Sequence, residues 1–312
     1  MAPRKKSNND DISRINQLLA MAWNANSASR ILSIAEQILS INPDNVEALL
    51  LKADRVEDVN LRVKILLHAI TAISKPENFT GEEDERNLVF VTLNHRLAYT
   101  FFVQENFNEA LKYCEDAINF ANDNEINMYD DDENGVMLAH LKALYYRILI
   151  NNKDWRKILT LTMKDEGKSL ARSYARLIAA WETAPKEKRQ SICASIFWDA
   201  LMMAPDVPFY ILGFFEEPDD PAEREIMTDF DFAVMYYDTV SISNDLYSWF
   251  SRGAILFGLL SGRFENDEYD YMLDALDNFG GYLEYQRMRN IITSTEDTEV
   301  IETLAANKCL TE

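Results

Sequence analysis

The segment from Asp130 to Gly135 is the part of the sequence closest to a metal-binding pattern. Asp130, Asp132 and Asn134 alternate as the oxygen ligands of a calcium loop do, and Gly135 stands where such a loop turns sharply. The loop would next need a bidentate acid at its twelfth position, where this chain has Leu141. Because that closing ligand is absent, we expect a polar linker between helices and no bound metal.

The other residue types that support catalysis do not form the pattern of an active site. His68, His95 and His140 lack the spacing of metal ligands, and His68 is expected on a helix surface beside the core residue Ala69. The sequence has no glycine-rich phosphate loop and no G-x-S-x-G nucleophile motif. Paired carboxylates are frequent, but in so acidic a chain they identify no general acid or base. We therefore expect neither an enzyme nor a cofactor.

The cysteines and the first residues indicate the compartment. Cys114, Cys193 and Cys309 are isolated and odd in number, which argues against a disulfide framework. Cys114 and Cys193 fall on apolar helix faces, where a thiol behaves as a small hydrophobe. The basic residues 1–11, which we expect to be disordered, are followed by no apolar run that would make a signal peptide. No apolar segment approaches the ~18 residues of a membrane span, so we expect a cytoplasmic protein.

The charge of the chain limits its partners. There are 52 acidic and 31 basic residues, which give a formal net charge of −21. A field of this sign repels nucleic acids and anionic membranes. We therefore expect a protein or peptide partner.

The acidic residues concentrate in two runs. Glu216–Asp231 holds eight acids and one base, and Glu265–Asp277 holds six acids and no base. One interpretation is a solvated surface that keeps the protein soluble. The other is a landing surface for a basic partner, which would gain association rate from electrostatic steering. The candidate residues for this second interpretation are Asp267, Glu268 and Asp270.

The elements that must position these residues are expected to be helices. Apolar residues recur with a helical period from Ile12 onward, and no long stretch alternates as a strand would. Thr80–Glu83 has the order of a capping box, and Gly280–Gly281 should end a helix that starts near Asp267. The sequence therefore predicts an all-α protein.

The clearest internal repeat lies between Val91 and Asn124. Small residues fall where two antiparallel helices must approach closely, and larger ones fill the spaces between. The small residues are Ala98, Ala110 and Ala117, and the large ones are Leu97, Phe101, Phe107 and Cys114. A helix pair of this kind cannot bury its apolar face alone, so it implies stacked neighbours.

This segment resembles a tetratricopeptide (TPR) repeat, although Asn94 replaces the usual aromatic residue. A preceding unit runs from Val46 to about Glu77, and an opening unit has helices at Ile12–Ala25 and around Ile31–Ile38. Weaker helix pairs follow at 138–150 with 155–162 and at 169–181 with 187–203. The resemblance implies a right-handed α-solenoid of stacked antiparallel helix pairs over residues 12–205.

Residues 206–312 fit no repeat cleanly. Ala200–Gly213, followed by a long acidic helix pair, resembles the carboxy-terminal region of the suppressor-of-tumorigenicity proteins, which also have TPR-like helices. We expect a divergent, acidic helical region that continues the solenoid.

In a stacked helical repeat, the first helix of each pair lines the concave side. The residues expected on that face are Glu47, Leu50 and Asp54 in one unit, Thr92, His95, Tyr99 and Phe102 in the next, and His140, Ala143 and Arg147 in the third. Tyr99 and Phe102 lie one helical turn apart and suit capture of a peptide or helix. The alternative is that they pack against an adjacent helix. His95 and Tyr99 stand where a TPR carboxylate clamp would need Lys and Asn.

Two functions remain open from the sequence. The first is a non-enzymatic scaffold or adaptor that binds a peptide or helix in its concave groove. The second is an acidic chaperone or nucleic-acid mimic that binds a basic partner through its charged carboxy-terminal surface. High salt should weaken the second kind of complex much more than the first.

Overall fold

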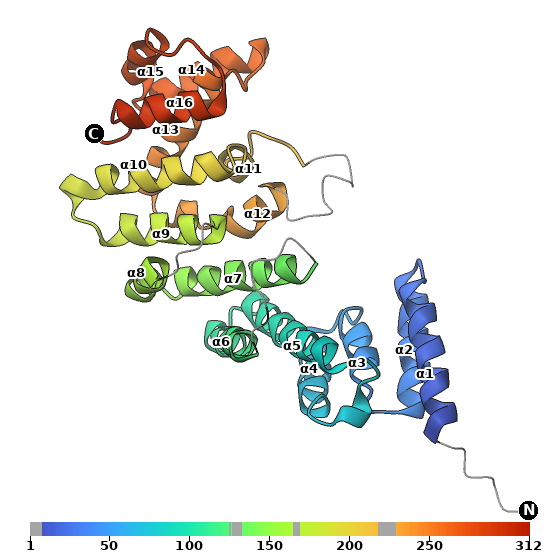
Figure 1. The fold of residues 1–312 in the computed structure, drawn as a ribbon. Helices are drawn as coiled ribbons and strands as arrows, with labels where there is room; N and C mark the ends of the chain where they lie inside the picture. The colour runs from blue at the N-terminus through green and yellow to red at the C-terminus, as the bar shows by residue number, and fades with distance from the viewer. Residues whose placement is uncertain (1–7, 125, 127–132, 165–168, 218–228) are drawn as a thin grey trace, which may run out of the picture. The chain divides into compact units, whose positions relative to one another are not determined.

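The computed structural model describes residues 8–124, 126, 133–164, 169–217 and 229–312 (Figure 1). Every regular element within these ranges is a helix, and none is a β-strand. The prediction of an all-α protein is therefore confirmed. The chain forms two compact units, Met1–Leu141 and Lys142–Glu312. The change of region expected at residues 205 and 206 falls inside the second unit and stays a prediction.

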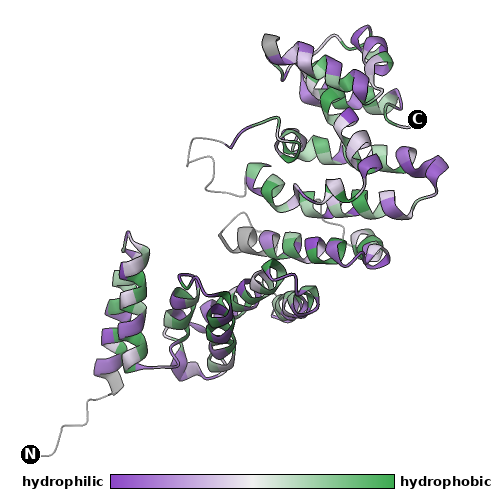
Figure 2. Cartoon of the chain, turned by 180° about the vertical axis from the view of Figure 1, so that it is seen from behind, coloured by the Kyte–Doolittle hydropathy of each residue, from purple (hydrophilic) through white to green (hydrophobic). Residues whose placement is uncertain are grey.

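The first unit contains a series of helices that each pack against the next one in sequence. These are α1 (Asn8–Trp23), α2 (Ala28–Ile41), α3 (Val46–Ala53), α4 (Val59–Ala72), α5 (Glu83–Val103) and α6 (Phe107–Asp123), with the 3-10 helix η1 (Pro76–Asn78) before α5. The buried hydrophobic residues of α1 and α2 form one core cluster, and Figure 2 shows hydrophobic and hydrophilic residues interspersed along both helices. Sequential packing agrees with stacked helix pairs, whereas the right-handed turn of a solenoid stays a prediction.

The helix pair α5 and α6 is built on small residues, as the sequence predicts. Ala98, Ala110 and Ala117 are fully buried, as is Cys114. Asn94, which replaces an aromatic residue of the repeat pattern, is also buried, and its side-chain amide donates to the Phe90 carbonyl at 2.9 Å. The polar side chain is therefore accommodated by a hydrogen bond within its own helix.

The start of α5 differs from the expected capping box at Thr80–Glu83. Glu82 is the N-cap residue, and the box is completed by Glu85, whose carboxylate accepts from the Glu82 backbone N–H at 3.0 Å. Thr80 instead donates through its backbone N–H to Glu47 at 3.0 Å, and its hydroxyl contacts the same carboxylate. The capping-box prediction was wrong by two residues because Glu47, distant in sequence, engages the threonine.

The second unit begins within α7 (Glu133–Asn151). Its helices are α8 (Trp155–Lys164), α9 (Leu170–Thr183), α10 (Lys186–Met203), α11 (Val207–Ile211), α12 (Asp229–Tyr236), α13 (Asn244–Ser261), α14 (Asn266–Asn278), α15 (Tyr282–Arg289) and α16 (Asp297–Ala306), with the 3-10 helix η3 (Val240–Ile242) before α13. Helix α14 ends before Gly280, whose φ of 74° lies in the left-handed region that glycine favours. The predicted end of this helix is therefore confirmed.

Helix α13 forms the centre of the second unit. Every residue from Gly253 to Ser261 is buried, and α13 contacts α11, α14, α15 and α16. At Gly258 a Cβ atom would lie 2.5 Å from the Phe264 ring, so the close packing there requires glycine. Although α13 is buried over its second half, none of the helices in the described ranges is long and apolar enough to cross a membrane.

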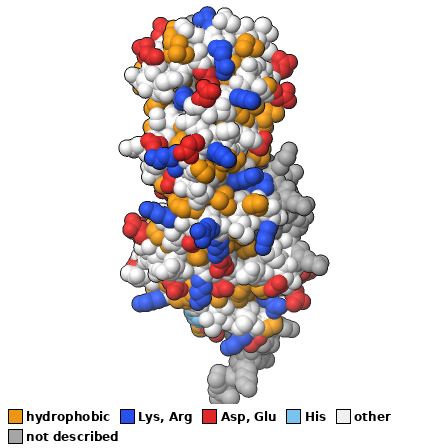
Figure 3. Space-filling view, turned by 90° about the vertical axis from the view of Figure 1, so that its left-hand side faces the viewer, with side chains coloured by type: hydrophobic (Ala, Val, Ile, Leu, Met, Phe, Trp, Pro, Cys, Tyr) orange, Lys and Arg blue, Asp and Glu red, His pale blue; other side chains and the backbone are white. Residues whose placement is uncertain are grey.

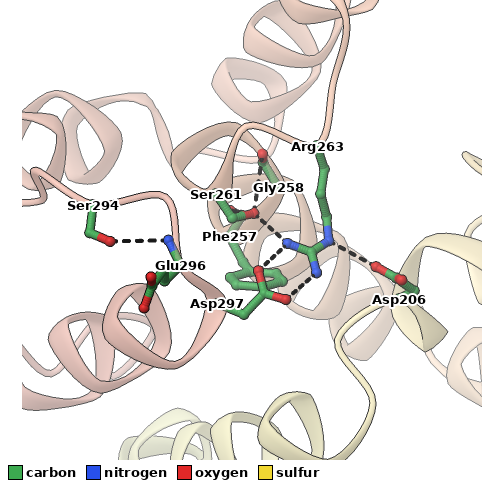
Figure 4. A network of polar contacts seen from close by, with 8 residues as sticks. All are labelled: Asp206, Phe257, Gly258, Ser261, Arg263, Ser294, Glu296 and Asp297. Carbon is green, nitrogen blue, oxygen red and sulfur yellow. Dashed lines mark hydrogen bonds and ion pairs between the residues drawn. The ribbon is translucent and has the colours of Figure 1, made fainter.

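Arg263 joins three segments of the second unit (Figure 4). Its guanidinium donates to both carboxylate oxygens of Asp297, at 2.6 and 2.7 Å, and through Nε to Asp206 at 2.8 Å. It also donates to the Ser261 hydroxyl at 2.8 Å and lies 4.6 Å from the centre of the Phe257 ring. The contacts tie the loop after α10 and the start of α16 to the end of α13.

Candidate binding surfaces

The groove residues expected on α3 are partly used by the fold. The Glu47 carboxylate accepts from Thr80 and, at 3.2 Å, from the Asn45 side chain. Leu50 is half-buried against the core of the first unit. Asp54, at the end of α3, pairs with Arg96 of α5 at 3.3 Å. Glu47 and Leu50 therefore hold the first unit together. Asp54 links α3 to α5 through its ion pair.

The four groove residues on α5 have different environments. Thr92 is half-buried, and its hydroxyl donates to the Leu88 carbonyl at 2.9 Å. Phe102 is half-buried and lies 5.6 Å from the Phe107 ring, so it packs against α6. Tyr99 is 49% exposed. Of the two aromatic residues proposed for peptide capture, only Tyr99 is exposed.

His95 lies beside Tyr99 on α5 and is half-buried. Burial lowers the pKa of His95 to about 3, and the charges of Arg96 and His140 act in the same direction. The imidazole is therefore neutral near pH 7. The neutral ring of His95 can form hydrogen bonds, but it provides no positive charge that would attract a carboxylate of a partner.

Val103, which is not among the groove residues expected from the sequence, is 58% exposed at the end of α5. Val103 follows Tyr99 by four residues, so both side chains lie on the same side of the helix. We call Tyr99 and Val103, with the Asp54–Arg96 ion pair beside them, the α5 surface. The sequence does hold a signal for this surface. Val103 is an apolar residue at a position where the repeat pattern requires no core residue.

Arg147 and Ala143 belong to the second unit, unlike the other groove candidates. The Arg147 guanidinium donates to the Asp238 carboxylate at 2.9 Å, and only 15% of the Arg147 side chain is exposed. Ala143 is buried, and its carbonyl accepts from the Tyr236 hydroxyl at 3.3 Å. Both residues of α7 therefore have roles in the packing of the second unit.

The acidic surface expected on α14 is partly described. Glu268 and Asp270 are exposed, and Tyr271 beside them is 66% exposed. Tyr269 points the other way, since its hydroxyl contacts the Tyr285 hydroxyl. The side chain of Asp267 lies outside the described residues, as does 218–228 of the first acidic run.

The residues with potential metal or thiol chemistry are placed as follows. Cys114, Cys193 and Cys309 are buried free thiols, and burial raises the pKa of each, to about 12 for Cys193 and Cys309. His68 is exposed, as predicted, and lies 2.8 Å from Asp44. No group of three His, Cys, Asp or Glu residues within the described ranges could hold a metal ion. Asp130 and Asp132 lie outside the described residues, as does the side chain of Asn134.

The second unit contains a cationic pocket that the sequence analysis did not find. It is lined by Lys186 and Arg189 of α10, Arg252 of α13, and the indole rings of Trp181 and Trp249. The bases Lys186, Lys188 and Arg189 form a short basic run, which was a signal in the sequence. The net charge of −21 gave no indication of this pocket, because a sum over the chain does not show a local excess of bases.

Comparison with known proteins returns no relative, since no family model, curated protein or solved structure matches the chain. The resemblance to TPR repeats therefore rests on the residues of Val91–Asn124 and stays a prediction.

Proposed function

We propose that this protein is a non-enzymatic interaction scaffold whose α5 surface binds a peptide or helix of a partner protein. The observation that supports the proposal is the exposure of Tyr99 and Val103, at 49% and 58%, on one side of α5. A tyrosine ring buried by a partner contributes apolar area, and its hydroxyl can form a hydrogen bond. Aromatic anchors of this kind dominate many protein interfaces.

The surroundings of Tyr99 support a partner with both apolar and charged residues. The Asp54–Arg96 pair is partly exposed, with 30% of the Asp54 and 47% of the Arg96 side chain accessible. An ion pair at the rim adds little affinity but fixes orientation, because a partner charge must match one of the two signs. An amphipathic helix with apolar residues spaced by three and four would match the spacing of Tyr99 and Val103.

The proposal includes the wider architecture expected from the sequence. Sequential packing from α1 to α6 supports a TPR-like, right-handed solenoid, which would extend the α5 surface into a concave groove. A cytoplasmic adaptor without cofactor or catalytic activity is the function that we infer for it.

The test uses an interaction partner identified by crosslinking from position 99. Tyr99→Ala combined with Val103→Ser should weaken the isolated complex by about tenfold or more, because an aromatic anchor is worth about 2 kcal/mol. Tyr237→Ala is the matched control, since Tyr237 is 60% exposed in the second unit. Equal binding by the double variant and the wild type would reject the α5 surface.

A second candidate function is the binding of a basic partner by α14. Glu268, Asp270 and Tyr271 are exposed side by side, which combines negative charge with an apolar anchor. An acidic chaperone or nucleic-acid mimic would use such a surface. Neutralising Asp267, Glu268 and Asp270 should then slow association at low salt more than it speeds dissociation. An unchanged association rate would leave α14 as a solvated surface.

A further inference from the structure

The cationic pocket of the second unit is formed by three helices that are separated in sequence. Trp181 lies near the end of α9, Lys186 and Arg189 lie on the first turns of α10, and Trp249 and Arg252 lie in α13. The cavity has a volume of about 300 Å³. Figure 3 looks onto the side of the molecule where α9 ends and α10 begins, and it shows Lys and Arg side chains there among Asp and Glu side chains. A pocket of this size can enclose a small anionic group but not a folded segment.

The floor of the pocket is aromatic and rigid. Trp181 and Trp249 are 2% and 4% exposed, and their ring centres are 5.0 Å apart. The Trp249 indole N–H donates to the Leu310 carbonyl at 3.0 Å, which fixes its orientation. The Arg189 guanidinium lies 5.2 Å from the Trp181 ring, so stacking holds this cation in place.

Three of the residues that line the pocket have a buried donor atom with no partner among the described residues. The donors are the Nε atoms of Arg189 and Arg252 and the indole Nε1 of Trp181. Arg252 does donate through Nη2 to the Gln190 side chain at 3.4 Å and to the Glu312 oxygen at 3.0 Å. A buried donor without an acceptor costs free energy, and an anion that accepts from it would remove that cost.

The electrostatics of the pocket favour a doubly charged anion. Lys186, Arg189 and Arg252 contribute three positive charges to the lining, and Asp245 contributes one negative charge, which leaves an excess of two. Within the described ranges, the three cations form no salt bridge with an acidic side chain, although Arg252 donates to the main-chain oxygen of Glu312.

We propose that this pocket binds a phosphoryl dianion, carried by a small molecule or by a phosphorylated side chain of a partner. A phosphoryl group carries about −1.5 to −2 charges at pH 7 and offers three acceptor oxygens. Its oxygens suit the two guanidinium groups, which present donors in a fixed planar fork, and Lys186 supplies a further charge at the rim. A single carboxylate would leave one positive charge of the lining uncompensated.

The test is calorimetric titration of the full chain with inorganic phosphate, with a phosphoserine peptide and with acetate. We expect saturable binding of one phosphate per chain, and weaker binding of acetate by about tenfold or more. A phosphoserine peptide that binds at least tenfold more tightly than phosphate would identify a modified protein as the source. Equal affinities would identify a small phosphorylated molecule.

Two variants on α10 provide a matched pair. Lys186 lines the pocket and Lys188 does not, although both are exposed and carry the same charge. Lys186→Ala should weaken phosphate binding by about fivefold, whereas Lys188→Ala should change it by less than about twofold. Arg189→Lys keeps the charge, loses the fork and should weaken binding by about tenfold.

Three results would overturn the proposal. The first is no saturable phosphate binding up to about 10 mM. The second is an equal loss of affinity in the Lys186 and Lys188 variants, which would indicate general attraction to a basic surface. The third is tighter binding of acetate than of phosphate. Because Lys186 is exposed, its replacement leaves the core intact, and circular dichroism of each variant verifies folding.

Discussion

Arg263 donates two parallel hydrogen bonds to the carboxylate of Asp297, at 2.6 and 2.7 Å, across 34 residues of the chain. Only 13% of the Arg263 side chain is exposed, whereas 39% of the Asp297 side chain is. The bond geometry is that of a bidentate arginine–carboxylate pair, which is stronger than a single neutral hydrogen bond. The packing of α16 against the rest of the second unit should depend on this pair.

We predict that Arg263→Ala destabilises the protein by about 1–3 kcal/mol, because it leaves Asp297 and Asp206 without their shared donor. Arg263→Lys should recover only part of the loss, since lysine retains the charge but not the fork. Urea denaturation followed by tryptophan fluorescence measures both. An unfolding midpoint of Arg263→Ala equal to that of the wild type would contradict the proposed role.

The pair also predicts how stability depends on pH. Hydrogen bonding to Arg263 lowers the pKa of Asp297. The ionised carboxylate therefore stabilises the folded chain above its unfolded pKa of about 3.9, and this contribution is lost as the pH falls through the lower, folded pKa. Asp297→Asn should be less stable than the wild type at pH 7, and the difference should shrink below about pH 3.

Thermal unfolding at a series of pH values measures this difference. Glu302→Gln is the control, because Glu302 is an exposed acid on the same helix. A constant difference between Asp297→Asn and the wild type at every pH would show that the asparagine acts by shape and not by charge.

The contribution of Asp229 to the pH dependence of stability should have the opposite sign to that of Asp297. Burial raises the pKa of Asp229, and the charge of Asp206 raises it further. The folded chain therefore binds the proton more tightly than the unfolded chain, so ionised Asp229 destabilises the protein, and stability is gained as the pH falls through the folded pKa. We predict that Asp229→Asn raises the melting temperature at pH 7 and loses this advantage in acid.

The matched variant for Asp229 is Asp199→Asn, which removes the same charge from an exposed site on α10. It should change the melting temperature little. If both variants stabilise equally, the effect comes from the net charge of the chain and not from the burial of Asp229.

The helix contact between α5 and α6 gives a fourth prediction. Ala110 is fully buried, and a leucine there would have to displace the facing helix. Ala110→Leu should therefore destabilise the protein by about 1–3 kcal/mol through overpacking. Ala20→Leu, at an exposed position of α1, serves as the comparison in chemical denaturation. Equal stability of the two variants would mean that the assigned repeat positions are wrong.

Several features of this protein could be predicted from local patterns in the sequence. The helical class, the buried alanines of α5 and α6, the exposed His68 and the end of α14 at Gly280 all depend on residues close together in the chain. Helical periodicity and turn chemistry act over a few residues, which is why they can be interpreted without a fold.

The candidate site was predicted only in part. Tyr99 is exposed, whereas Phe102 packs on Phe107 and Arg147 pairs with Asp238. The repeat pattern places a residue on a helix face, but it does not show which neighbouring side chain will cover that face. Glu47 illustrates this, because its partner Thr80 lies 33 residues away.

The sequence by itself determined the helical class, the end of α14 at Gly280 and the excess of acid. The tertiary structure decided which distant side chains meet, as when Arg263 joins Asp206 to Asp297 and when α9, α10 and α13 bring three cations and two indole rings to one pocket. The physical reason is that helix formation follows from interactions between residues a few positions apart, whereas a charged cluster requires the packing free energy of the whole unit to hold like charges together.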